Sequence, residues 1–331
     1  MLLRISMLIL CGLTLTACNI GLGVSQTPNR EVTAEVQQAS ETPLATIAQP
    51  PTPLATSSPV EKLPTPTNTP SETPAPLVAT ARVSQAMIID HRAADLFNEI
   101  PNEAIASAAE LRLMYRHASV GENISFGLNC LRGNFPDRRP TACSSLHDLK
   151  YNRDNWSFQF RGNPGWIEKV DDFIVQTELQ IDDFDVFTFS LGYIDGLDGG
   201  TYPIISEPDN FRELLFDKLE GLEAAYPEKT FILWTMPLAR LGYANTQMYN
   251  EMVRNYALEN NQILFDIADI ESHDPLGNKI MNEEGYDVIY QGYTDESRAG
   301  HLNTAGRERV AKAFWYLMAR VSGWEGVPGG P

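Results

Sequence analysis

Two hydrophobic patterns alternate along the last three quarters of the chain. Apolar residues recur every three to four positions in four segments, which predicts amphipathic helices over 166–179, 209–225, 246–259 and 304–321. Short apolar runs lie between them and predict buried strands over 111–115, 185–191, 230–238 and 263–270. Strands separated by such helices need crossover connections. The pattern therefore predicts an α/β fold, a three-layer α/β/α sandwich with a mostly parallel central sheet.

The first quarter of the chain lacks both patterns. Residues 19–84 hold 11 of the 22 prolines and 11 threonines, and no Phe, Trp or Tyr precedes Phe97. Such a stretch cannot bury enough apolar surface to offset the entropy lost on ordering. We expect 19–84 to be a disordered Pro/Thr-rich tether, and 85–325 to form one domain.

Residues 1–18 have the pattern of an export signal. Arg4 precedes an apolar run that is too short to span a bilayer. The run ends in Leu-Thr-Ala-Cys, which looks like the lipobox of bacterial lipoproteins. This resemblance implies a lipid-modified (palmitate-bearing) Cys18, and an exported protein anchored on the extracytoplasmic face of a membrane. The alternative is an ordinary signal peptide that ends at Ala17.

The remaining cysteines fit an oxidising compartment. Cys130 and Cys143 enclose twelve residues with no strong helical pattern, and export favours a disulfide between them over free thiols. A metal site would need more ligands, and only His147 is close in sequence.

Charge narrows the range of partners. The formal net charge is -18, nearly all of it outside the first 84 residues. A domain this acidic repels phosphate backbones, which argues against nucleic-acid binding. We expect a monomer without a cofactor.

Two polar segments lie where α/β proteins place their sites. One follows a predicted strand, and the other precedes a predicted helix. Ser119 follows the first strand and precedes a glycine, as a nucleophile would. His301 lies in a polar loop before the last helix, as a general base would. Taken singly, the first could be a helix cap and the second a surface histidine.

Together these segments resemble the SGNH/GDSL hydrolase family over about residues 109–322. The resemblance rests on 117–124, 161–166 and 301–307, although His-Ala stands where the family's GDS signature has Gly-Asp. It implies the fold of that family, a serine ester hydrolase activity, Ser119 as nucleophile and His301 as base. It also implies an oxyanion hole from Ser119 and Gly162, with Gly165 as the alternative glycine.

Two family positions are irregular here. Ile194 occupies the place of the usual oxyanion-hole Asn, and Asn163 is the expected substitute. Arg298 occupies the place of the usual acid, so Asp295 is expected to orient His301, in preference to Glu296. A third possibility is a Ser–His dyad without an acid.

The resulting hypothesis is a membrane-tethered serine esterase that removes acyl groups from carbohydrate or a small molecule, with substrate contacts from Arg116, His117 and Tyr193. The alternative is a non-catalytic carbohydrate- or ligand-binding lipoprotein. One further polar group follows the fourth strand. We interpret it as turn and cap residues, not as a metal site: Asp266, Asp269, His273 and Asp274.

Overall fold

The computed structural model describes residues 85–132, 143, 148–197 and 211–331. The predicted signal peptide with Cys18, the predicted tether and His147 lie outside these residues. Among the helices described, none is long and apolar enough to cross a membrane.

One sheet of six parallel strands forms the centre of the domain. Its strand order is β1-β6-β5-β4-β2-β3. The four inner strands are short and mostly buried, as expected for strands covered on both faces, whereas the two edge strands are mostly only partly buried. The strands are β1 (Met87–Ile89), β2 (Leu113–His117), β3 (Trp156–Phe160), β4 (Val186–Phe189), β5 (Thr230–Trp234) and β6 (Ile263–Phe265).

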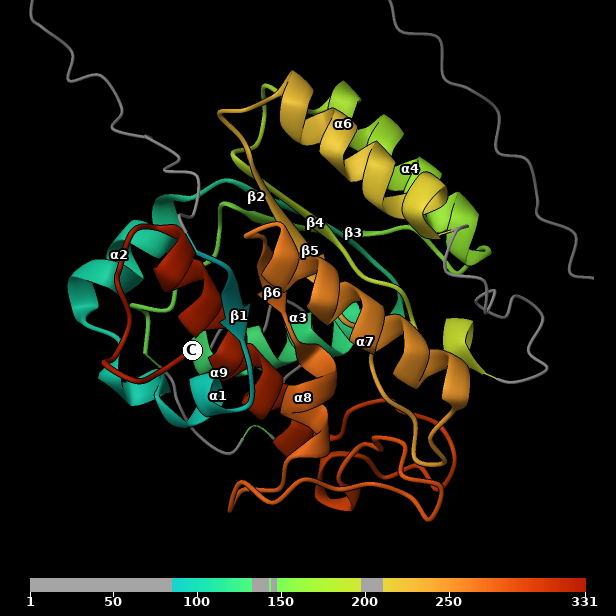
Figure 1. Cartoon of the computed structure of the whole chain (residues 1–331). Coiled ribbons are helices and arrows are strands. Elements are labelled where there is room, and N and C mark those ends of the chain that lie inside the picture. Colours follow the sequence, from blue (N-terminus) through green and yellow to red (C-terminus); the bar gives the residue numbers. More distant parts are fainter. Residues whose placement is uncertain (1–84, 133–142, 144–147, 198–210) are drawn as a thin grey trace, which may run out of the picture. The chain divides into compact units, whose positions relative to one another are not determined.

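Helices cover both faces of this sheet and build two separate apolar cores (Figure 1). One core is formed with α1 (Arg92–Asp95), α2 (Asn102–Glu110), α3 (Ser119–Arg132), α8 (Ile267–Ser272) and α9 (Thr304–Val321). The other is formed with α4 (Trp166–Leu179), α6 (Asp217–Ala225) and α7 (Ala244–Glu259). The predicted α/β sandwich with a parallel sheet is therefore confirmed.

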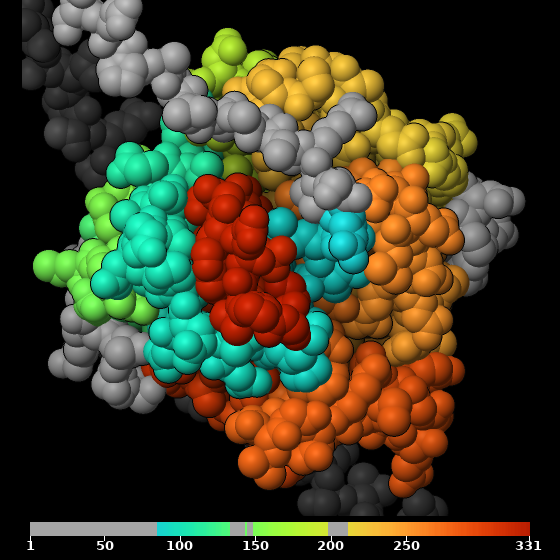
Figure 2. Space-filling model, turned by 60° about the vertical axis from the view of Figure 1, so that its left-hand side comes forward, coloured from blue at the N-terminus to red at the C-terminus, as the bar shows by residue number. Residues whose placement is uncertain are grey.

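The first and last elements of the domain share one layer. Helix α9 packs against α1, α2 and α3. Figure 2 shows the same proximity at the surface, where red C-terminal residues lie between cyan residues from the start of the domain. The chain therefore closes the domain by returning its last helix to the first strand and helices.

Six predicted elements differ in their bounds from the structure. The predicted strands over 230–238 and 185–191 are shortened to Thr230–Trp234 and Val186–Phe189, and the predicted helix over 246–259 begins at Ala244. The predicted strand over 263–270 ends at Phe265, because the Asp266 side chain accepts a hydrogen bond from the Asp269 N–H and caps α8. The predicted helix over 209–225 is a π-helical segment, Arg212–Phe216, followed by α6. The predicted strand over 111–115 is shifted to Leu113–His117. The pattern of the chain did not reveal β1, α2 and β3.

The predicted disulfide is confirmed. Cys130, near the end of α3, is bonded to Cys143, and their Cα atoms lie 5.4 Å apart.

Candidate active site

Ser119 is the first residue of α3, two positions after the end of β2. It is partly exposed, and the helix begins with a hydrogen bond from the Glu122 N–H to the Ala118 carbonyl. The first N–H groups of a helix have no partner within the helix, and the helix dipole makes this end positive. A negative charge that develops near Ser119 would be stabilised here.

A close approach of strand and helix fixes this turn. A Cβ atom on Gly121 would lie 2.3 Å from Cβ of His117, so only glycine fits there. His117 itself is 3% exposed, and its ring lies against Tyr115 and Phe158. Burial lowers the pKa of the His117 imidazole, which keeps the ring neutral. The expectation that His117 contacts substrate conflicts with this burial.

His301 lies in the loop between η4 (Gln291–Tyr293) and α9. Its Nδ1 atom is 2.9 Å from Oε1 of Glu296, and its backbone N–H donates to Oε2 at 2.8 Å. The Thr294 hydroxyl donates to the His301 carbonyl at 2.7 Å and accepts from the Glu296 N–H. The loop thus folds back on itself and orients the imidazole.

The carboxylate that contacts the His301 ring belongs to Glu296, and not to Asp295 as expected. Asp295 instead accepts a hydrogen bond from the Asn303 side chain at 3.1 Å. The longer Glu296 side chain reaches both the ring and the backbone N–H of His301, which explains the difference. Partial burial raises the pKa of Glu296, but the two hydrogen bonds from His301 outweigh it and hold that pKa below its usual value. Glu296 is therefore ionised at neutral pH.

Asn123 links the helix that begins with Ser119 to the loop that carries His301. Its side-chain oxygen accepts a hydrogen bond from the Leu302 N–H at 2.8 Å, and the side chain is buried. Residues four apart share one face of a helix, so Ser119 lies one turn before Asn123 on the face that meets the His301 loop. Asn123 was not predicted from the sequence. The signal was a polar residue on an apolar helix face, four positions after the candidate nucleophile.

Tyr193 lies next to His301. Its hydroxyl is 3.4 Å from Nδ1 of His301, and the two rings meet edge to face with centroids 5.3 Å apart. The segment that carries it is held by a buried ion pair between Lys169 and Asp195, in which Nζ lies 2.6 Å from Oδ2. The same carboxylate accepts from the Gly192 N–H at 2.8 Å. This clamp fixes the path of the chain after β4.

Gly162 and Asn163 follow β3 and lie beside this segment. The Arg161 N–H donates to the His117 carbonyl at 2.9 Å, and its guanidinium donates to the Ser190 carbonyl. Gly162 has φ +76°, which glycine adopts without strain. Oδ1 of Asn163 lies 3.9 Å from the place a Cβ atom would take on Gly192. The alternative glycine, Gly165, is the N-cap of α4.

Arg116 points away from Ser119 and His301. Its guanidinium pairs with Asp172 of α4 at 2.7 Å and also donates to Gln159. Successive residues of a strand face opposite sides of the sheet, so Arg116 faces the α4 side while its neighbours face α3. The expected substrate contact from Arg116 conflicts with this pairing.

Comparison with known proteins gives only distant likeness. Neither the protein-family models nor the curated proteins include a match. Among solved structures, the acetyl xylan esterase AlAXEase has 18% identity and a TM-score of 0.39, over 61% of this chain and 97% of its own. An acetyl-xylooligosaccharide esterase from Geobacillus stearothermophilus has 15% identity and a TM-score of 0.38, over 65% and 95%. An α/β hydrolase from the metagenome of Lake Arreo has 15% identity and a TM-score of 0.39, over 63% and 95%.

Proposed function

We propose that this domain is a serine ester hydrolase that acts by two-step acyl transfer. The observation that carries the proposal is the placement of His301. Its Nδ1 atom is held by the ionised Glu296, and its loop is bonded through Asn123 to the helix that begins with Ser119. A serine, an imidazole and a carboxylate in this order form the arrangement that activates a hydroxyl nucleophile.

The proposed reaction follows from which nitrogen of His301 is available. Since Nδ1 is on Glu296, Nε2 is the atom that accepts the proton of Ser119 while Oγ attacks the ester carbonyl carbon. The tetrahedral intermediate collapses, the C–O bond to the leaving group breaks, and His301 returns the proton to the departing alkoxide. Water then attacks the acyl-enzyme with His301 as base, which releases the acid and restores Ser119.

The oxyanion of both intermediates would be bound by backbone N–H groups. The positive end of α3 supplies that of Ser119. Gly162 and Asn163 are the remaining proposed donors, because they follow β3 next to Gly192 and His117. Asn163 would replace the donor that Ile194 cannot supply.

Incubation of the full-length chain with a fluorophosphonate probe tests the proposal. We expect wild type to be labelled and to hydrolyse p-nitrophenyl acetate. Ser119→Ala should abolish labelling and reduce turnover at least about 10³-fold. Ser125→Ala is the matched control, because Ser125 lies on the same helix and contacts Arg153. Equal labelling of Ser119→Ala would show that another residue is the labelled nucleophile, and neither labelling nor hydrolysis by wild type would favour a ligand-binding protein.

We also propose that the enzyme is a lipoprotein anchored through Cys18 on the extracytoplasmic face of a membrane and that it deacylates carbohydrate. The lipobox-like residues and the Pro/Thr-rich stretch support this location, where polymers are within reach of a tethered domain. Metabolic labelling with a palmitate analogue tests the anchor. We expect label in wild type and none in Cys18→Ala, and label retained in Cys18→Ala would contradict it.

A further inference from the structure

Three potential metal ligands meet just beyond the ends of β1 and β6, which pair at one edge of the sheet. His91 follows β1, whereas Asp269 and His273 belong to the segment after β6. The two strands pair in parallel, and the Asp266 N–H donates to the Ile89 carbonyl, so their following segments lie together. Residues 178 positions apart in the sequence therefore come into contact.

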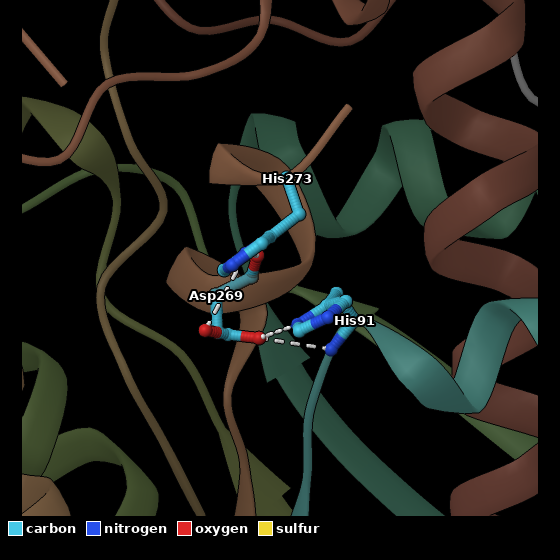
Figure 3. A group of neighbouring side chains, drawn as sticks. All are labelled: His91, Asp269 and His273. Carbon is cyan, nitrogen blue, oxygen red and sulfur yellow. Dashed lines mark hydrogen bonds and ion pairs between the residues drawn. The ribbon is translucent and has the colours of Figure 1, made fainter. Parts of the chain in front are cut away.

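The Asp269 carboxylate lies against both imidazoles (Figure 3). Its Oδ1 atom is 2.5 Å from Nδ1 of His91 and also accepts from the His91 N–H at 3.0 Å. Its Oδ2 atom is 3.5 Å from Nδ1 of His273, which also lies 2.7 Å from the Asp269 carbonyl. One ligand atom from each of the three residues lies within 4.8 Å of the others.

The two rings are stacked, with centroids 3.7 Å apart and planes 11° from parallel. Each ring therefore presents a nitrogen to the single Asp269 carboxylate.

Two nearby guanidinium groups pair with other carboxylates. Arg309 pairs with Asp95 at 2.9 Å and also donates to the His91 carbonyl, and Arg92 pairs with Asp90 at 2.6 Å. Among the described residues, Asp269 forms ion pairs with His91 and His273. The side chains of His91 and Asp269 are 21% and 20% exposed, so an ion and a completing water have access from solvent.

We propose that His91, Asp269 and His273 form a binding site for a divalent transition-metal ion of the Zn²⁺ class. Two imidazole nitrogens and one carboxylate oxygen are the ligand types this class prefers. Asp269 and His273 are four residues apart and so share one face of the chain at the end of α8. The ion would join the edge strand β1 to α8.

Titration of the chelator-treated full-length chain with Zn²⁺, by calorimetry, tests this proposal. We expect one equivalent to bind, and His91→Ala and His273→Ala each to weaken binding at least about tenfold. Asp274→Asn is the matched control. This neighbouring carboxylate is bonded to the Leu276 and Asn278 N–H groups and should leave binding unchanged. No stoichiometric binding, or unchanged binding in both histidine variants, would overturn the proposal.

A second measurement avoids dependence on variants that remove the ring stack. X-ray absorption of the Zn²⁺-loaded wild-type chain reports the ligands directly, and we expect two imidazoles per ion. A spectrum with fewer than two would refute the site. The proposal is independent of the esterase activity.

Discussion

Histidine–carboxylate contacts occur in two regions of this domain and differ in their ratio of rings to carboxylates. Before α9, one carboxylate, Glu296, holds one imidazole, that of His301, and both side chains are more than one third exposed. After β1 and β6, one carboxylate, Asp269, contacts the Nδ1 atoms of two imidazoles that stack on each other. Both regions combine histidine with a carboxylate, but they arrange these groups differently.

This ratio decides what each region can do. A single ring on a carboxylate is stabilised when it gains a proton, and its second nitrogen can give the proton back. Two rings beside one carboxylate offer two imidazole nitrogens and one carboxylate oxygen within 4.8 Å of one another, which are ligand types of a divalent transition metal. We therefore expect proton transfer in the first region and cation binding in the second.

Removal of the charge in the first region should have the largest effect. Glu296→Gln retains the size of the side chain, but its amide cannot stabilise the imidazolium or accept both His301 hydrogen bonds. We expect turnover of p-nitrophenyl acetate to fall by about 10²–10⁴-fold. Asp295→Asn is the control, because Asp295 contacts Asn303, and its turnover should stay near wild type. Equal losses in both variants would show that Glu296 has no special role.

A buried carboxyl group connects the two regions and should have the next largest effect. Glu271 lies on α8 with Asp269 and is fully buried, and its Oε2 atom accepts from the Leu238 N–H at 2.7 Å. The Leu238 carbonyl would lie 2.0 Å from a Cβ atom on Gly300, next to His301. Burial raises the pKa of Glu271 to about 8.

The sign of the pH effect follows from this raised pKa. Between the unfolded pKa and about 8, the folded chain keeps a proton that the unfolded chain releases, so stability falls as pH rises. We expect the contribution of Glu271 to the free energy of unfolding to fall by up to about 4 kcal/mol from pH 5 to pH 8. We expect the free energy of unfolding, measured with urea at both pH values, to change less between them in Glu271→Gln than in wild type. An equal change in the two proteins would contradict the prediction.

Sequence patterns predicted the layers of this fold better than its contacts. Periodicity found α4 and α9 to the residue, because long amphipathic helices repeat their pattern several times. It missed β1, whose three residues are too short to show any period. Periodicity also extended a strand through Asp266, where a side-chain cap starts α8 instead.

The candidate sites show the same limit. Motifs made Ser119 and His301 candidate catalytic residues, but which acid reaches His301 depends on how the loop folds back through Thr294. Asp269 and His273 of the proposed metal site were both noted after β6 from the sequence. Their neighbours Asp266 and Asp274 are cap or turn residues, as expected. His91 could not be added from sequence, because only the pairing of β1 with β6 brings it there.

A cross-test of the two regions measures a smaller effect, the change in Zn²⁺ affinity. His301→Ala should abolish hydrolysis and leave Zn²⁺ affinity within about twofold of wild type, whereas His273→Ala should weaken Zn²⁺ binding about tenfold. The reason is that the two groups of ligands share no residue. Calorimetry and turnover measured on the same preparations provide the comparison. Loss of Zn²⁺ binding in His301→Ala would place the ion at the candidate active site.

The smallest effect is expected at Tyr193. Its hydroxyl lies 3.4 Å from Nδ1 of His301, which already has the shorter 2.9 Å contact with the charged Glu296. A charge-assisted bond dominates a long neutral one, so Tyr193→Phe should reduce turnover only about two- to fivefold. Tyr193→Ala also removes the edge-to-face ring contact and should cost more. A loss in Tyr193→Phe as large as that in Glu296→Gln would mean that the hydroxyl, and not the carboxylate, holds the imidazole in place.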